Sequence, residues 1–315
     1  GDALVTRRLL AQAQEAAAAS RKASGVTRQI KKRQKSLSFP KVTGNKNHPL
    51  QQIFTDMEVL FESEDVLVLS KPSGVLMHPV KSTPNKGRAS VTLADALMKV
   101  YGEDGLSQIS EFPGIVHRLD KGTSGILFIA KSDLAHALLA SLFFKRKVQK
   151  RYQALVPSCP VDEKGEEVDC GTIDAKVDGL PAQSSWRVLE KFPGSGKSTS
   201  ASLIEVSPMQ GRKHQVRAHL SVLGCPLLLD PIYKASSKSR AGVNERNSVH
   251  NYIDQLAKAW DDDRFFLHSS SYMVPEFVLK PLERSENAEL CTESHLFEAA
   301  RPAWFEEVLS TLRKN

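Results

Sequence analysis

Short runs of consecutive apolar residues place the strongest limit on how this chain folds. Val66–Leu69 and Ile126–Ala130 are uninterrupted apolar runs next to turn residues, which indicates two buried strands. The segments 152–156, 185–189 and 201–206 have strand-like composition, and the last two are separated by a Gly- and Ser-rich turn. Because strands outnumber helices and no regular strand–helix alternation appears, we predict an α+β fold with a mixed, largely antiparallel sheet.

Apolar residues at helical spacing predict the helices that flank this sheet. We expect helices near 93–101, after the N-cap residue Ser132, at Lys213–Leu223, and after Pro302, which suits a first helical turn. No apolar run approaches the roughly 18–20 residues that span a bilayer, so no membrane partner is predicted.

Charge separates a basic extension, residues 1–56, from a body, residues 57–315. Residues 1–50 hold 11 Lys and Arg against 2 Asp and Glu, a balance of +9, so the remainder carries −2 of the total +7. Such an extension, with an Ala-rich helix expected at 5–20, either binds a polyanion or is a solvated arm without a partner. Within the body, the polar segment 235–262 predicts an inserted loop with one helix.

The composition of the extension also bears on location. It is rich in Ala, Ser, Arg and Lys and begins with Gly1 rather than Met, which is typical of a trimmed product with an organellar transit remnant. We therefore expect a mitochondrial or other organellar location, with the cytoplasm or nucleus as the alternative. The four cysteines lie far apart and form no CxxC pair, which fits a reducing compartment and predicts no cysteine zinc site.

Two weaker patterns are better explained by structure than by chemistry. Gly194–Ser198 has the ending of a phosphate-binding loop, but Lys191 stands where that pattern needs Gly, so we interpret it as a turn between strands. His214 and His219 are five positions apart and no HExxH surrounds them, so no metal site is predicted.

The segment HRLDKGTSG, residues 117–125, carries the most chemical information. It is a polar, glycine-containing loop directly before the buried run 126–130, and it places His117, Arg118 and Asp120 at the edge of a sheet. Functional side chains often lie on such loops. The structural alternative is a turn in which Asp120 caps a backbone group.

HRLD followed by TSG resembles the signature of RluA-type RNA pseudouridine synthases. Other segments resemble that family's motifs in the family's order, and the resemblance spans residues 57–310, about four-fifths of the chain. These segments are VLVLSKPSGVLMHP (67–80), KRYQALV (150–156), GRKHQVRAHLSVLGCPLLLDPIY (211–233) and LHSSSYMVPEF (267–277). The resemblance implies a pseudouridine-synthase-like catalytic domain with flanking helices. It implies an isomerase that converts a uridine in RNA to pseudouridine.

The resemblance also implies the catalytic set. Asp120 matches the catalytic aspartate, and Arg217 matches the arginine that pairs with it and keeps it ionised. Tyr152 matches the tyrosine that stacks on the target uracil, with proton removal from C5 as a second candidate role.

Four further residues are implied to bind the substrate. Arg118 matches an arginine that fills the gap left by the flipped nucleotide, with a phosphate contact as the alternative. His117 is expected to orient the loop, and Lys71 and His214 lie in the matching motifs.

The implied reaction breaks the C1′–N1 bond of uridine, turns the base and rejoins it through C5. An ionised carboxylate beside the ribose either attacks C1′ or removes the C2′ proton to give a glycal, and the sequence leaves both routes open. Neither redox chemistry nor hydrolysis occurs, so no metal and no organic cofactor is expected.

Departures from the family pattern concern the choice of substrate more than the chemistry. Gln210, Leu229 and Ser269 stand where the family favours Thr, Gly and Ala. The expected partner is RNA, and more specifically ribosomal RNA or a pre-ribosomal particle. The alternative is a non-catalytic RNA-binding factor of ribosome assembly that retains the fold.

Overall fold

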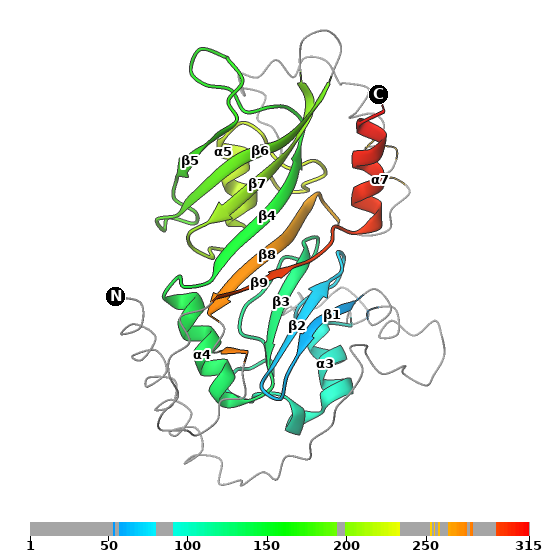
Figure 1. The fold of residues 1–315 in the computed structure, drawn as a ribbon, viewed down its shortest axis with the longest axis vertical. Helices are drawn as coiled ribbons and strands as arrows, with labels where there is room; N and C mark the ends of the chain where they lie inside the picture. Colours follow the sequence, from blue (N-terminus) through cyan, green and yellow to red (C-terminus); the bar gives the residue numbers. More distant parts are fainter. Residues whose placement is uncertain are drawn as a thin grey trace, which may run out of the picture. The chain divides into compact units, whose positions relative to one another are not determined.

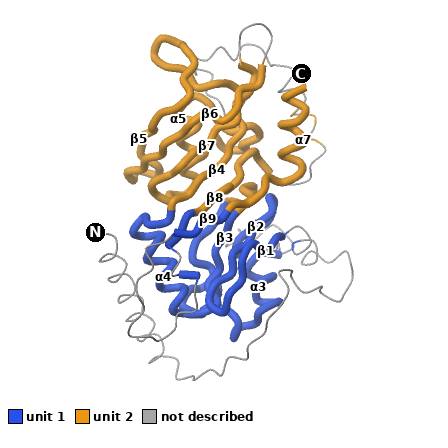
Figure 2. The backbone as a smooth tube through the Cα atoms, viewed as in Figure 1, with its two compact units in different colours: residues 1–119, 126–148, 273–297 blue, residues 120–125, 149–272, 298–315 orange. Residues whose placement is uncertain are grey.

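The computed structural model describes residues 57–79, 91–193, 199–233, 264–275 and 294–314, with a few single positions beside them. The chain divides into two compact units, which Figure 2 colours separately. Unit 1 consists of residues 1–119, 126–148 and 273–297. Unit 2 consists of residues 120–125, 149–272 and 298–315. The chain passes from one unit to the other within β3 (Ser124–Ala130) and within β8 (Leu267–Pro275).

The described part of unit 1 contains two α-helices and a group of strands (Figure 1). Strand β1 (Glu58–Glu62) pairs antiparallel with β2 (Val66–Lys71), and β3 is the next strand in order. The predicted strands and helices of this unit are confirmed: every residue of β3 is buried, and the helices are α3 (Leu93–Tyr101) and α4 (Asp133–Phe144). Ser132 caps α4 as predicted, because its hydroxyl accepts a hydrogen bond from the backbone N–H of Ala135.

Unit 2 is built on a larger group of strands. Their order is β8, β4 (Gln149–Val156), β7 (Thr199–Pro208), β6 (Gln183–Pro193) and β5 (Cys170–Asp174). The pairs β4–β7, β7–β6 and β6–β5 are antiparallel, whereas β3 and β8 pair in parallel at Ser124–His268 and Gly125–Ser269. This arrangement confirms the predicted α+β class with a mixed, largely antiparallel sheet.

Helices cover both faces of the unit 2 sheet. Along β4, Ala154 and Val156 pack in one core cluster with α5 (Gln215–Val222), whereas Leu155 packs in a second cluster with α7 (Ala303–Leu312). Successive side chains of a strand point to opposite faces, so α5 and α7 lie on opposite sides of the sheet. The result is a helix–sheet–helix arrangement with a core on each side.

Some elements differ from the sequence predictions. Helix α5 begins at Gln215, not Lys213, because His214 has a left-handed backbone with φ of 56° that cannot continue a helix. Short strands β1, β5 and β9 (Ser294–Glu298) and the 3₁₀ turn Glu103–Gly105 were not predicted. The expected helix at 5–20, the turn at 194–198, most of the extension 1–56 and almost all of the insert 235–262 lie outside the described residues. Among the described helices, none has the length and apolar character needed to cross a membrane.

Candidate active site

Two residues 97 positions apart in sequence meet in unit 2. The Nη1 of Arg217 donates a hydrogen bond to Oδ2 of Asp120 at 3.0 Å. This distance confirms the proximity that the sequence predicted for the pair. The side chain of Asp120 remains 20% exposed, whereas that of Arg217 is 4% exposed. One oxygen of the Asp120 carboxylate is therefore bonded to a buried guanidinium, and the side chain remains partly open to solvent.

A second carboxylate fixes the arginine. Arg217 donates to both oxygens of Asp230, from Nε to Oδ2 at 2.7 Å and from Nη2 to Oδ1 at 2.8 Å. Oδ1 of Asp230 also accepts backbone N–H bonds from Ile232 at 2.9 Å and Tyr233 at 3.0 Å. The Asp230 side chain is fully buried. A guanidinium matches a carboxylate in this two-bond geometry, so the orientation of Arg217 is set before any substrate arrives.

The ionisation of this buried pair follows from its contacts. Burial acts to raise the pKa of Asp230, but the guanidinium of Arg217 and the two backbone N–H groups outweigh it and lower that pKa. Burial likewise acts to lower the pKa of Arg217, but its hydrogen bonds to Asp230 and Asp120 outweigh it and raise that pKa. Both groups therefore stay charged at neutral pH.

Aromatic rings enclose the guanidinium. The carbon Cζ of Arg217 lies 4.5 Å from the ring centre of Phe265 and 5.3 Å from that of Tyr233. Rings at these distances attract a cation and exclude water from it. The arginine is thus held by three hydrogen bonds to carboxylates and by contacts with two aromatic rings.

The turn that carries Asp230 explains one departure from the family pattern. Leu229 has φ of 64°, a left-handed conformation that glycine adopts without steric cost. Its side chain packs against both core clusters of unit 2, which offsets that cost. Leucine therefore preserves the turn in which the family favours glycine.

The loop that carries Asp120 is tied to strand β8. The backbone N–H of Thr123 donates to the carbonyl of Asp120 at 3.1 Å, which closes the turn. The next residue, Ser124, lies 2.9 Å from Nδ1 of His268, and Nε2 of His268 lies 3.0 Å from the carbonyl of Ala299. A carbonyl only accepts, so Nε2 carries the proton and Nδ1 accepts from the serine hydroxyl. Burial lowers the pKa of His268 to about 4, which keeps the ring neutral.

Gly125 allows this loop to approach β8 closely. A Cβ atom at this position would lie 2.1 Å from the carbonyl oxygen of Ser269, and the backbone φ is +110°. Neither the space nor the conformation suits a side chain. The glycine that ends the TSG motif is therefore required for the β3–β8 pairing beside Asp120.

Tyr152 lies on the α5 side of the sheet, where it packs against the core cluster that contains Val216. Its hydroxyl is 2.8 Å from the hydroxyl of Tyr272. Burial, together with the Tyr272 hydroxyl and the charge of Asp120, raises the pKa of Tyr152 well above its usual value. The phenol is therefore protonated at neutral pH and offers a flat ring and a hydroxyl, not a phenolate base.

His214 completes the surroundings of Asp120. Its Nε2 lies 3.6 Å from Oδ1 of Asp120, too far for a hydrogen bond. Burial lowers the pKa of His214, and the charges of Arg217 and Lys213 lower it further, against the opposing effect of Asp120. At this distance His214 leaves Oδ1 of Asp120 without a hydrogen bond to any described residue.

The other predicted site residues belong to unit 1. The Nζ of Lys71 is buried and donates to the carbonyls of Pro72 and Val75 in its own turn, at 2.8 and 3.0 Å. Nε2 of His117 accepts the backbone N–H of Phe128 at 2.9 Å, which links the HRLD segment to β3. Arg118 is exposed and makes no ion pair with a described residue. Their roles toward a substrate stay predictions.

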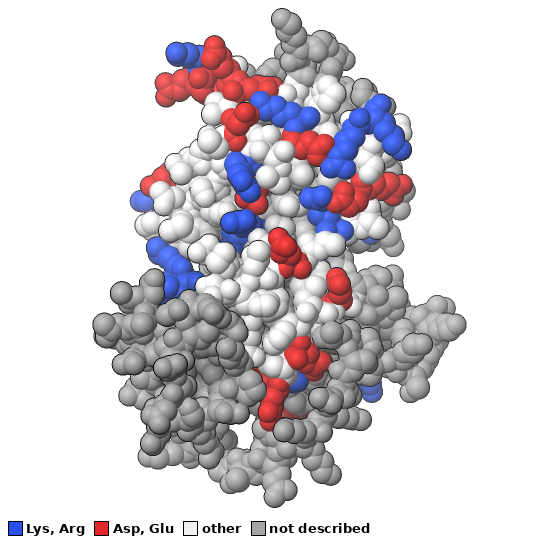
Figure 3. All heavy atoms as spheres, in the orientation of Figure 1, with Lys and Arg blue, Asp and Glu red and all other residues white. Residues whose placement is uncertain are grey.

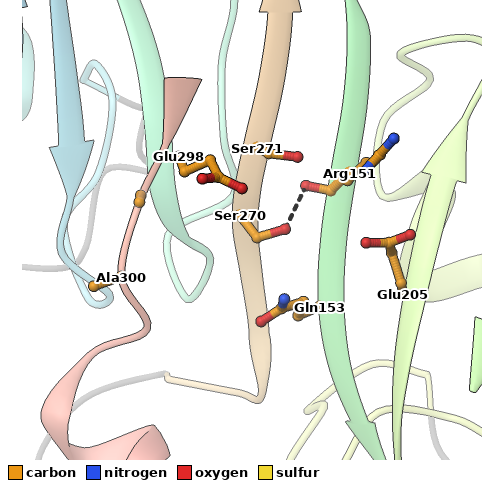
Figure 4. Close-up of a pocket in the computed structure, with 8 residues that line it drawn as sticks. Arg151, Gln153, Glu205, Ser270, Ser271, Glu298 and Ala300 are labelled. Carbon is orange, nitrogen blue, oxygen red and sulfur yellow. Dashed lines mark hydrogen bonds between the residues drawn. The ribbon is translucent and has the colours of Figure 1, made fainter. Parts of the chain in front are cut away.

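A separate pocket lies on the other face of the unit 2 sheet (Figure 4). It has a volume of about 300 Å³ and is lined by polar side chains that include Arg151, Gln153 and Glu205. Arg151 and Gln153 flank Tyr152 along β4, so their side chains point away from the face that carries Tyr152. This pocket is therefore distinct from the Asp120 site.

Sequence reasoning gave no role to three residues of the site. Asp230 stands within a quoted motif, but no spacing or residue type in the sequence shows that it binds Arg217. His268 was also within a motif, but its bond to Ser124 depends on the β3–β8 pairing. Phe265 has no sequence signal at all, because an aromatic residue before a strand is ordinary core.

The comparison with known proteins agrees with this geometry. A sequence model of RNA pseudouridylate synthase matches residues 65–222, half of the chain. The chain belongs to the RNA pseudouridylate synthase family. The similarity to proteins named ribosomal large subunit pseudouridine synthase D confirms the resemblance to its RluA-type members.

Two relatives illustrate the extent of the match. Ribosomal large subunit pseudouridine synthase D of Zymomonas mobilis is 36% identical over 197 residues, 58% of this chain and 57% of that protein. The protein of the same name from Nitrosomonas europaea is 32% identical over 239 residues, 71% of this chain and 62% of that protein. The match thus spans less than two thirds of the length of either relative.

A solved structure shares the fold. Human RNA Pseudouridylate Synthase Domain Containing 4 superposes with a TM-score of 0.56 and 21% identity. The superposition covers 84% of this chain and 95% of the human chain. At that identity the likeness concerns the fold alone.

Proposed function

We propose that this protein is an RNA pseudouridine synthase that isomerises a uridine, with Asp120 as the catalytic carboxylate. One observation carries the proposal. Asp120 has one oxygen bound to a buried, pre-oriented arginine and the other oxygen without a hydrogen bond to a described residue. A carboxylate held in this way presents a single basic, nucleophilic atom in a fixed direction.

The residues around Asp120 have complementary tasks. Arg217 is a positioning residue, because its bonds to Asp230 fix the guanidinium that orients and neutralises Asp120. Tyr152 supplies an aromatic face for the uracil ring once the nucleotide has left its helix. Since Tyr152 stays protonated, the basic group of the site is the carboxylate of Asp120.

The bond changes balance without a co-reactant. The C1′–N1 bond breaks, the uracil turns, a C1′–C5 bond forms, and the C5 proton leaves for solvent while N1 gains a proton. Asp120 serves either by attacking C1′ or by removing the C2′ proton, and in both routes it is released unchanged at the end.

Ribosomal RNA is the substrate we propose. The support is that relatives 36% and 32% identical to this chain are named for the large ribosomal subunit. Mapping of pseudouridines in ribosomal RNA from cells with and without the protein tests this choice. We expect that at least one ribosomal position loses its pseudouridine when the protein is absent. If every ribosomal pseudouridine is unchanged, ribosomal RNA is not the substrate.

The catalytic proposal is tested with Asp120→Asn on large-subunit ribosomal RNA transcripts tritiated at C5 of uridine. Release of tritium is expected to fall at least about 100-fold, the scale of one acid–base or nucleophilic group. The control is Asp174→Asn, an exposed carboxylate of β5 in the same unit, which should retain full activity. Full release by Asp120→Asn refutes the assignment, and no release by the wild type favours a non-catalytic RNA-binding factor.

A further inference from the structure

Helix α4 of unit 1 ends in an exposed aromatic ring followed by cations. The side chain of Phe144 is 87% exposed, and Lys145, Arg146 and Lys147 follow it directly. The preceding Phe143 instead packs against the ring of His117, with 4.4 Å between ring centres. The helix thus ends in two neighbouring rings, of which Phe143 packs inside the protein and Phe144 faces solvent. Core packing explains Phe143 but not Phe144.

The backbone at this helix end is well defined. The N–H of Lys147 donates to the carbonyl of Leu142 at 2.9 Å, and the N–H of Arg146 donates to that of Phe143 at 3.1 Å. These bonds end the helix in a Schellman motif, in which the residue at the position of Arg146 is usually glycine. Arg146 has φ of 59°, a left-handed conformation that disfavours a side chain. The chain therefore keeps a guanidinium where glycine would be more stable.

Two cations of this turn, Arg146 and Lys147, have no acidic partner among the described residues. Arg146 and Lys147 are exposed, and neither forms an ion pair with a described residue. The sequence from 134 to 161 contains no Asp or Glu. Figure 3 shows Lys and Arg atoms spread over the described surface. The positive charge of Arg146 and Lys147 is therefore available to an anion.

We propose that Phe144–Lys147 is an RNA-contact element. The Phe144 ring stacks on an unpaired base of the RNA, and Arg146 and Lys147 bind the adjoining phosphates. A flat ring beside cations is the combination that binds single-stranded nucleic acid, because every base has a face to stack on and every nucleotide carries a phosphate. This inference rests on the proposed function. It gives the RNA substrate a second point of contact on the protein.

The ring is tested by fluorescence anisotropy with a labelled oligouridylate. Phe144→Ala and Phe144→Leu are both expected to raise the Kd at least about fivefold, the lower end of what stacking on one base contributes. Phe144→Trp, which keeps an aromatic face, should bind at least as tightly as the wild type. Leu180→Ala, which removes an exposed apolar side chain of unit 2, is the control and should leave the Kd unchanged. If Phe144→Ala binds the oligouridylate with the Kd of the wild type, the stacking role is overturned. It is also overturned if Phe144→Leu and Phe144→Trp lose the same affinity.

The cations are tested by the salt dependence of the same binding. The double variant Arg146→Gly, Lys147→Gln should reduce the slope of log K against log salt by about 1.4, or roughly 0.7 for each phosphate contact on a single strand. Lys99→Gln, in the last turn of α3 in the same unit, should leave the slope unchanged. An unchanged slope in the double variant overturns the phosphate contacts.

Arg146→Gly alone separates binding from folding. Because glycine suits the left-handed cap, this variant should unfold at the same or a higher denaturant concentration while it binds RNA more weakly. If the arginine serves only the helix dipole, the variant loses stability and keeps its affinity, and the inference fails. Failure of the proposed function is visible in the wild type, which would not release tritium, whereas failure of this inference is visible only in the variants.

Discussion

The buried bond between Arg217 and Asp230 leads to the sharpest prediction. Asp230→Asn keeps the size of the side chain and an oxygen that can accept the N–H groups of Ile232 and Tyr233. It removes the charge that faces a guanidinium only 4% exposed. Loss of one partner from a buried ion pair costs about 3–5 kcal/mol. Since Arg217 retains its hydrogen bond to Asp120, we expect a loss near the lower end, roughly 3 kcal/mol.

This loss is measurable by calorimetry. About 3 kcal/mol corresponds to a fall in Tm of roughly 6–12 °C for a unit of this size. Turnover should also fall, by between roughly 10-fold and 100-fold, because the guanidinium that orients Asp120 is no longer fixed. The Kd for RNA should change little, since Asp230 is buried and distant from solvent.

The control and the refuting results are specific. Asp174→Asn removes an exposed carboxylate and should alter the free energy of unfolding by less than about 0.5 kcal/mol. If Asp230→Asn unfolds and turns over like the wild type, the two-bond contact contributes nothing and our description of the site is wrong. If stability falls but kcat does not, Asp230 supports the fold without positioning Arg217 for catalysis.

Two further predictions concern the loop that carries Asp120. Gly125→Ala should cost roughly 3 kcal/mol or more, because overpacking against Ser269 adds to backbone strain. Gly179 also has a positive φ, +76°, but nothing lies within 4 Å of its added Cβ, so Gly179→Ala should show only the strain. Equal losses in denaturant unfolding would rule out the clash. The pKa of His268 is about 4 in the folded chain against a usual 6.5, so the unfolded chain binds the extra proton first and stability is lost as pH falls from 6.5 toward 4, by about 3 kcal/mol. Unfolding measured across that range should show the slope, and His268→Gln should lack it; a slope that persists in the variant would contradict the assignment.

Local patterns in the sequence predicted much of the fold. The apolar run of β3, the Ser132 cap of α4 and the spacing within α7 are each set by neighbouring residues, so they could be inferred without knowledge of the rest. Strands β5 and β9 could not, because each is short and mostly exposed and becomes a strand only by pairing with a neighbour. The start of α5 was misplaced because His214 adopts a conformation that its residue type rarely takes.

The residues of the site also divide into those that the sequence predicted and those that it did not. Asp120 and Arg217 were paired in advance because both lie in motifs of the resembled family, and their 3.0 Å contact agrees. The second carboxylate, Asp230, was not, because the residue types do not reveal that one guanidinium bridges two acids. The bond between Ser124 and His268 likewise depends on strand pairing over 144 positions.

The bridged arrangement of two carboxylates around one guanidinium also limits what can enter the site. With Asp120 and Asp230 ionised, the three groups carry a net charge of −1, and His214, whose pKa is lowered by burial, adds no positive charge at neutral pH. At an effective dielectric constant of 20, a net charge of −1 repels a phosphate 4 Å away by about 4 kcal/mol, and the positive charge of Lys213 reduces this repulsion. Uracil and ribose are uncharged and meet no such barrier. In the function we propose, the site therefore favours the uncharged nucleoside over the phosphates of the RNA backbone.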